Sequence, residues 1–115
     1  MSTKVEIGKI QSVKFGSGGY QDAMLGISIG LGSDKNGWGC GDFKGAWDLH
    51  ITVDKHTKWT EADRDKQLAE TMRYVSDLLT KAKVDDVYKL VGIPVEVTFG
   101  GTGMLKSWRI LEEVL

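Results

Sequence analysis

A chain of 115 residues with 41% hydrophobic and 27% charged side chains has the size and composition of a single soluble globular domain, which excludes a disordered chain. Its net charge of -1 provides no basic excess for phosphate backbones, and no apolar run reaches membrane-spanning length. We therefore expect neither a membrane protein nor nucleic acid as a direct partner. The lone Cys40 excludes internal disulfides, and with no signal-like leader it favours the cytoplasm.

The first third of the chain predicts two β-strands. Apolar residues from Val5 to Phe15 predict a first strand, with an irregularity at Gly8 where the alternation shifts phase. After a glycine turn at 16–19, clean alternation over residues 22–31 predicts a second strand. The other face of that strand carries only small residues, which either allow close packing or form the floor of a ligand pocket. These floor residues are Gly26, Ser28 and Gly30.

Residues 32–45 are rich in glycine and predict turns. Asn36-Gly37 is typical of a type I′ hairpin turn. A short strand is expected to begin at Trp38. A further strand is predicted over residues 47–53, where apolar side chains alternate with polar ones. Those apolar residues are Trp47, Leu49, Ile51 and Val53.

Residues 60–83 predict one long amphipathic helix. Apolar residues recur at steps of four and three and predict the buried stripe, while the opposite side, which includes Arg64 and Gln67, is polar. Thr60 is the expected N-cap, and Glu61 and Asp63 suit the helix dipole in the first turn. The members of the stripe are Leu68, Met72, Val75, Leu79 and Ala82.

The last third predicts a short helical turn and a hairpin. Asp85 is expected to cap a turn that ends at Gly92, Pro94 opens a strand, and residues 104–111 return after a glycine loop. The order of elements predicts one α+β domain over residues 1–115. Its mostly antiparallel sheet of about five strands packs against the one long α-helix.

Chemical motifs are weak in this sequence. The glycines do not lead into a helix with Gly-Lys-Ser/Thr, so a phosphate loop is not expected. Cys40, Asp42 and His50 belong to a group of donors whose spacing fits no metal-binding pattern. Nothing places a base beside Cys40 to activate it as a nucleophile. We therefore expect no cofactor, no metal site and no catalytic residues, and an enzyme is the least favoured class.

Aromatic residues in or beside the glycine-rich turns are the strongest candidates for a binding surface. Aromatic side chains on turns either cover the core or anchor a partner, and the sequence leaves both interpretations open. The candidate partner-binding residues are Tyr20, Trp38, Asp42, Phe43 and Trp47.

Several runs resemble small uncharacterised accessory proteins of bacteriophages and prophages. They are IQSVKFGSGGYQDAMLG from Ile10, GWGCGDF from Gly37, LVGIPVEV from Leu90 and WRIL from Trp108. The resemblance covers most of the chain but includes no catalytic motif, so no functional residues are carried over. It implies an accessory protein in an infected bacterial cytoplasm that binds a host protein and inhibits an antiviral defence, as anti-CRISPR proteins do. The alternative is a small-ligand or nucleotide binder that uses the floor residues, and a homodimer through a sheet edge is also expected.

Overall fold

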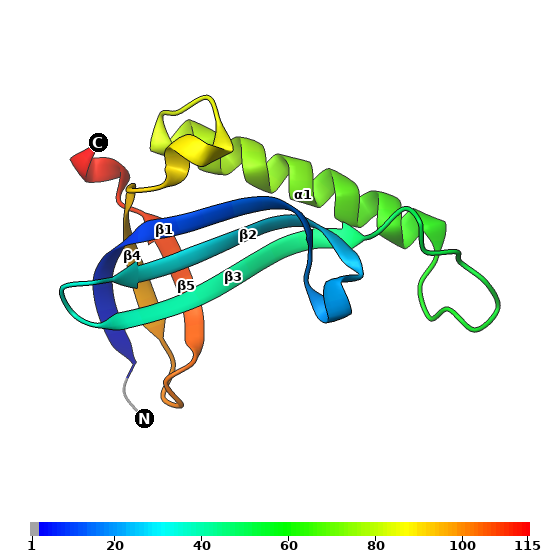
Figure 1. The fold of residues 1–115 in the computed structure, drawn as a ribbon, viewed down its shortest axis with the longest axis horizontal. Coiled ribbons are helices and arrows are strands. Elements are labelled where there is room, and N and C mark those ends of the chain that lie inside the picture. Colours follow the sequence, from blue (N-terminus) through cyan, green and yellow to red (C-terminus); the bar gives the residue numbers. More distant parts are fainter. Residues whose placement is uncertain (1–2) are drawn as a thin grey trace.

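The computed structural model describes residues 3–115 and consists of one five-stranded antiparallel sheet and one long helix (Figure 1). The predicted α+β class is confirmed. Three short 3-10 helices, η1 (Tyr20–Asp22), η2 (Val87–Leu90) and η3 (Glu112–Val114), complete the fold. The main elements are β1 (Lys4–Gly18), β2 (Met24–Ser33), β3 (Trp38–Trp47), α1 (Glu61–Ala82), β4 (Pro94–Phe99) and β5 (Leu105–Ile110).

The strands lie in the order β3-β2-β1-β4-β5, and the long β1 joins the two halves of the sheet. Its first half pairs with β4, from Lys4 to Lys9, and its second half pairs with β2, from Lys9 to Gly18. The register shifts between Ile10 and Ser12, which marks a β-bulge at this junction. Because a bulge bends the strand, β4 and β5 run across the direction of β2 and β3 (Figure 1).

The bulge changes which residues of β1 face the core. Ile10 is fully buried, whereas Val5 and Ile7 are 55% and 52% exposed on the other side of the sheet. Val5 and Ile7 belong to the first strand as predicted but lie on its exposed side, and the irregularity predicted at Gly8 lies at Gln11 instead. Gly8 has a different role, because a Cβ atom there would lie 2.5 Å from the carbonyl oxygen of Gly32.

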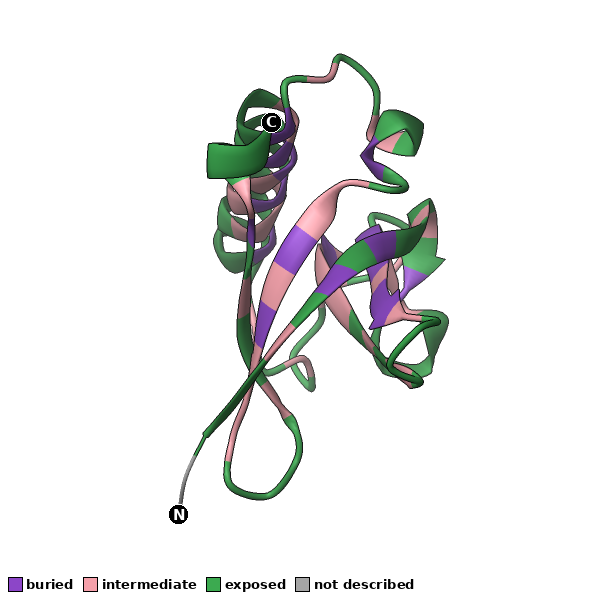
Figure 2. Cartoon of the chain, turned by 90° about the vertical axis from the view of Figure 1, so that its left-hand side faces the viewer, coloured by how far each residue is buried: buried purple, intermediate pink, exposed green. Residues whose placement is uncertain are grey.

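The core lies between the inner face of the bent sheet and one side of α1. Figure 2 shows the buried segments of α1 on the side that faces the strands. The core consists of branched or small apolar side chains, and their removal from water supplies the main stabilisation of the fold. The cluster consists of Ile10, Ile27, Ile29, Leu31, Val75, Leu78, Ala82, Leu90, Val95, Val97 and Ile110.

The ends of α1 match the prediction, while part of its buried face does not. Thr60 and Asp63 form a reciprocal capping box, and Lys83 ends the helix in a left-handed conformation. Val75 and Ala82 are buried as predicted, but Met72 is 59% exposed and Arg64 is only 4% exposed. The first turns of α1 face the loop at 48–60, and this contact turns Arg64 inward.

The predicted strand over residues 47–53 is wrong, because the glycine-rich segment itself forms β3. After β3 the chain makes tight local turns in which the carboxylates of Asp48 and Asp54 accept hydrogen bonds from the backbone N–H groups of His50 and His56, at 2.9 and 2.8 Å. The turn before β3 spans residues 34–37, and among its residues only Gly37 has a positive φ, of 69°. It is therefore longer than the predicted type I′ turn.

Candidate functional site

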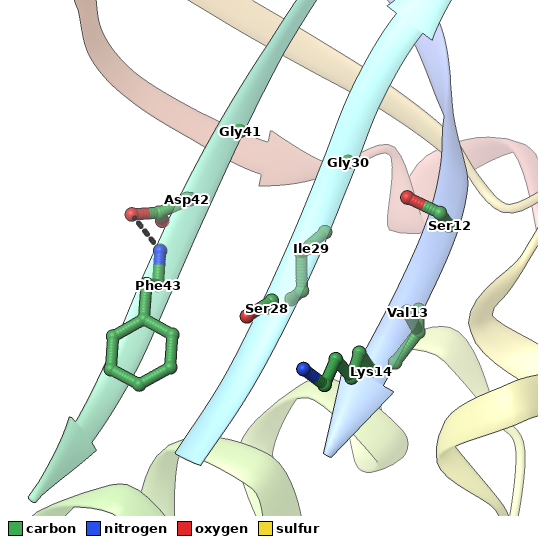
Figure 3. A pocket seen from close by; sticks show the side chains of 9 residues that line it. All are labelled: Ser12, Val13, Lys14, Ser28, Ile29, Gly30, Gly41, Asp42 and Phe43. Carbon is green, nitrogen blue, oxygen red and sulfur yellow. Dashed lines mark hydrogen bonds between the residues drawn. The ribbon is translucent and has the colours of Figure 1, made fainter. Parts of the chain in front are cut away.

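Most residues on the side of β1, β2 and β3 that points away from the core are glycines or serines. Cross-strand pairing aligns Ser12 with Gly30 and Gly41, and it aligns Lys14 with Ser28 and Phe43. Figure 3 shows these rows crossing the three strands. We call this surface the outer face. Its members are Lys9, Ser12, Lys14, Gly16, Gly18, Met24, Gly26, Ser28, Gly30, Gly32, Gly39, Gly41, Phe43, Gly45 and Trp47.

Close contacts between strands explain some of the outer-face glycines but not all of them. A Cβ atom on Gly26 would lie 2.2 Å from the carbonyl oxygen of Lys44, so only glycine fits there. At Gly41 the nearest atom to an added Cβ is the carbonyl oxygen of Ile29, at 3.7 Å, which is ordinary contact. The structure therefore has room for a side chain at Gly41, and its absence leaves the backbone accessible to a ligand.

Phe43 is the aromatic side chain beside the glycine and serine rows at the centre of the outer face. Cβ atoms added to Gly18, Gly19 and Gly45 would come within 3.0, 3.0 and 2.7 Å of atoms of its ring. The ring thus lies against glycines, is half-buried, and borders the open floor formed by Ser28 and its neighbours (Figure 3). An aromatic ring beside a flat, accessible floor can stack with a planar group of a ligand.

Two neighbouring hollows extend over this surface. A shallow one of about 450 Å³ lies over Ser12, Lys14, Ser28, Gly30, Gly41 and Phe43, and Asp42 is also among its lining residues. A larger groove of about 970 Å³ crosses the bend of β1, between the turn at 34–36 and the segment 91–94. The groove is lined by Ile7, Lys9, Gln11, Gly32, Val91 and Pro94 among others. Gln11 and Gly32 line the groove, and their near neighbours Ser12 and Gly30 on the same strands line the shallow hollow. The two hollows are therefore adjacent.

The charge of the outer face differs from that of the whole chain. Its only charged members are Lys9 and Lys14, both exposed. The carboxylate of Asp42 belongs to the opposite face, where it accepts a hydrogen bond of 2.8 Å from the indole N–H of Trp108. Asp34, in the adjoining turn, accepts a hydrogen bond of 3.3 Å from the amide of Gln11. The charged side chains that stand on the outer face are therefore cationic, with Asp42 and Asp34 at the borders of its two hollows, although the chain carries a net charge of -1.

The three residues predicted as a pocket floor, Gly26, Ser28 and Gly30, lie together on the outer face. The five predicted partner-binding residues do not form one surface. Trp38 packs against the core, edge-on to Phe99 with ring centroids 5.5 Å apart. Phe43 lies on the outer face, and Tyr20, in the turn between β1 and β2, is 67% exposed.

Trp47 belongs to a stacked cluster that sequence reasoning missed. Its ring is parallel to that of Trp59, with centroids 5.5 Å apart, and the guanidinium of Arg64 lies 5.1 Å from the centre of the Trp59 ring. Arg64 also donates hydrogen bonds to the carbonyl oxygens of Asp48 and Ile51, at 2.7 and 2.8 Å, and pairs with Glu61. The alternation of apolar and polar residues that begins at Trp47 predicted a strand, so the sequence did not indicate that Trp47 stacks on Trp59.

Groups that could perform catalysis are dispersed. Burial, followed by the nearby Asp42 carboxylate, raises the pKa of the Cys40 thiol, which disfavours the reactive thiolate. Backbone and ring hydrogen bonds from His50 lower the pKa of Asp48, while the imidazole of His50 is exposed to solvent. Among residues 3–115, no three side chains of His, Cys, Asp or Glu converge in a way that could hold a metal ion.

Tyr74 lies in a crevice between α1 and the two edge strands β3 and β5. The crevice has a volume of about 420 Å³ and is also lined by Asp42, Asp77 and Trp108. Burial, then the carboxylates of Asp42 and Asp77, raise the pKa of the Tyr74 hydroxyl well above its usual value. The crevice and the hydrogen bond from Trp108 to Asp42 mark where the two edges of the bent sheet approach each other without pairing.

No protein-family model, curated protein or solved structure matches this chain. Within the part of the chain that the structure describes, no helix has the length and apolar character needed to cross a membrane.

Proposed function

We propose that this protein is a non-enzymatic binding protein that holds single-stranded nucleic acid on its outer face. The observation that carries this proposal is the make-up of that face, where exposed backbone, two lysines without a carboxylate among them, and Phe43 lie side by side. Sequence-independent binding of single strands uses cationic groups for the phosphates and aromatic rings for the bases.

The connectivity of the fold supports the same ligand class. A five-stranded antiparallel sheet, bent until its edge strands β3 and β5 are bridged by Asp42 and Trp108, is similar to the partly open barrel of the OB-fold. OB-fold domains bind oligonucleotides and oligosaccharides on the face of their second and third strands. Because folds of one kind bind many different ligands, the choice of ligand here rests on the chemistry of the outer face.

Local charge explains why the proposal departs from the expectation based on net charge. The net charge of -1 averages over the whole surface, whereas a bound strand meets only the face on which it lies. On the outer face Lys9 and Lys14 are available to phosphates, and Phe43 is available to a base. With so few cationic groups, we expect binding that weakens steeply when salt is added.

Fluorescence anisotropy with a labelled deoxythymidine strand of about 20 nucleotides, longer than one OB-type site, tests the proposal. Loss of one stacked base on Phe43→Ala should weaken binding by about 5- to 150-fold. Lys14→Ala should make the salt dependence shallower by about 0.7 in the log–log slope. Tyr88→Ala and Lys66→Ala, which change exposed residues outside the outer face, are the matched controls.

A variant that preserves the fold makes the result decisive. Gly41→Glu has room for its side chain and places a carboxylate in the middle of the outer face, so it should abolish binding, whereas Gly41→Ser should bind. Competition with free nucleotides distinguishes a strand from a small ligand on the same floor. If the wild-type protein does not bind the strand at low salt, or if Gly41→Glu binds it as well as the wild type does, the proposal fails.

A second candidate function rests on the groove of about 970 Å³. Ile7 and Val91 line this groove while 52% and 50% exposed, and apolar side chains of this kind serve as anchors in protein interfaces. In this function the chain is a phage or prophage accessory protein that binds a host protein in the bacterial cytoplasm, including a component of antiviral defence. Affinity purification from bacterial lysate should recover one host protein with the wild type and with Tyr88→Asp but not with Val91→Asp.

A further inference from the structure

The first half of β1 has an unpaired edge. The backbone N–H of Ile10 donates to the carbonyl oxygen of Ile93 at 2.9 Å, so the backbone groups of Ile10 point toward β4. In an antiparallel ladder this direction alternates with every residue, so those of Val5 and Ile7 point toward the opposite edge. Within residues 3–115, β2 pairs with β1 only from Lys9 onward, and no strand covers the edge before it.

The side chains at this edge are apolar on one face and oppositely charged on the other. Val5 and Ile7 are exposed on the side that is continuous with the outer face. Lys4 and Glu6 lie on the other side and form an ion pair of 3.0 Å with each other. Edge strands that remain single are usually short, bulged or protected by charges that hinder pairing. Here the backbone groups and the apolar side chains both favour an added strand.

We propose that this edge pairs with the same edge of a second copy of the chain, antiparallel and about a two-fold axis at Val5. Val5 then lies opposite the partner's Val5, and Ile7 lies opposite the partner's Thr3. The backbone groups that point outward are those of the odd-numbered residues, which meet as hydrogen-bonded pairs in this register. Each protomer thus offers the backbone groups that the other lacks, as an isologous interface requires.

Charge selects this register over its neighbours. With the axis at Val5, Lys4 lies opposite the partner's Glu6, and Glu6 lies opposite the partner's Lys4. Opposite charges at facing positions stabilise a strand pair, and like charges destabilise it. With the axis at Glu6, two carboxylates face each other. With the axis at Ile7, the charged Lys9 faces the partner's Val5. Only the axis at Val5 satisfies both charges and keeps the apolar residues on one side.

A charge exchange tests the pairing. Analytical ultracentrifugation across a range of concentrations should show a monomer–dimer equilibrium for the wild type. Glu6→Lys and Lys4→Glu, studied separately, should each weaken the dimer by roughly tenfold or more, because each places like charges at both facing positions. An equimolar mixture of the two variants should dimerise again, since every facing pair in the mixed dimer is then opposite in charge. Circular dichroism of each variant checks that the fold is retained.

Cross-linking tests the register. In a hydrogen-bonded pair the two Cα atoms lie about 5.5 Å apart, within the range that a disulfide spans. Val5→Cys should therefore form a covalent dimer on oxidation. Ile7→Cys should not, because the two copies of residue 7 are then roughly 14 Å apart, four residues along the strand. The wild type, whose Cys40 lies on the inner face, is the control.

Each outcome decides the proposal. A chain that stays monomeric up to about 1 mM, or a dimer that the charge variants do not weaken, overturns it. Cross-linking through Ile7→Cys but not Val5→Cys overturns the register. A monomer that instead binds an extended peptide along this edge, detected by its loss in Val5→Lys, assigns the edge to a foreign strand and overturns pairing between copies.

Discussion

Replacing Arg64 by Met should destabilise the protein strongly and detach the loop at 48–60. Two charge-assisted hydrogen bonds, to the carbonyl oxygens of Asp48 and Ile51 at 2.7 and 2.8 Å, are lost in this variant. Such bonds contribute about 1.5–3 kcal/mol each, and the contact with Trp59 adds about 0.5–2 kcal/mol. Because these contacts share one side chain, they are not additive, and the loosened loop regains hydrogen bonds to water. We expect a loss of about 3 kcal/mol in the free energy of unfolding.

Urea denaturation and thermal melting measure this loss, which corresponds to a decrease in Tm of about 10–15 °C for a domain of this size. Tryptophan emission at low urea reports the loop separately, because Trp59 leaves its stacked position on Trp47 when the loop detaches. Arg73→Met is the matched control, since Arg73 is exposed on the same helix and should change the stability by less than about 0.5 kcal/mol. If Arg64→Met changes the free energy of unfolding by less than about 0.5 kcal/mol, as an ordinary surface substitution does, the reasoning is refuted.

Three further substitutions have defined outcomes. Gly26→Ala should lower the free energy of unfolding by about 1–3 kcal/mol, measured by urea denaturation, because its Cβ would lie 2.2 Å from a carbonyl oxygen of the next strand. Gly41→Ala should cost nothing, because the nearest atom to its Cβ would be 3.7 Å away. Equal losses in the two variants would contradict the packing argument. Trp108→Phe removes the hydrogen bond to Asp42 and should cost about 1.5 kcal/mol, measured in the same way, and an unchanged midpoint would show that this bond does not hold the edges of the sheet together. The raised pKa of Tyr74 means that the unfolded chain loses this proton near pH 10 while the folded chain keeps it, so the free energy of unfolding should fall above pH 10 and fall less in Tyr74→Phe. Identical alkaline melting curves for that pair would contradict the burial of the hydroxyl.

Local signals in the sequence were sufficient for the helix and for two of the strands. Thr60 and Asp63 form the cap at the start of α1, and the alternation from Leu25 to Leu31 places those residues on the inner side of β2. Pro94 begins β4, with Val95 and Val97 buried, as predicted. Each of these features depends on residues close together in the chain, so periodicity and capping rules are enough to find it.

The start of β3 at Trp38 was predicted, but its extent to Trp47 was not, because its glycines were interpreted as turns. Gly39, Gly41 and Gly45 keep the two-residue period of a strand, but they place no side chain on one face, so the usual alternation of apolar and polar residues is absent. The apparent alternation after Trp47 was misleading, since Asp48 and Asp54 bind the backbone locally and break the strand there. Glycines that alternate on adjacent segments are the signal that could have identified this pair of strands.

The faces of the sheet could not be assigned from sequence, and the candidate site depended on them. One extra residue in β1 reverses the side to which every earlier side chain points, and this moved Val5 and Ile7 to the surface. Trp38 and Phe43 are both aromatic and five positions apart, an odd number, so they lie on opposite faces of β3, and the pairing with β2 decides which of them faces the core. Whether an aromatic residue is in the core or is a candidate ligand contact thus depends on long-range strand pairing, which composition does not encode.

The division of β1 between two partners also has a consequence during synthesis of the chain. Its second half can pair with β2 as soon as that strand is made, but residues Lys4–Lys9 pair with Pro94–Phe99. At 5–20 residues per second, the ribosome adds the intervening chain in roughly 4–17 s. Throughout that interval Val5 and Ile7 belong to a strand that lacks its β4 neighbour, so the nascent N-terminal segment is exposed to aggregation and to chaperones. Mutations that raise the apolar character of this segment should therefore reduce the yield of folded protein before they change its equilibrium stability.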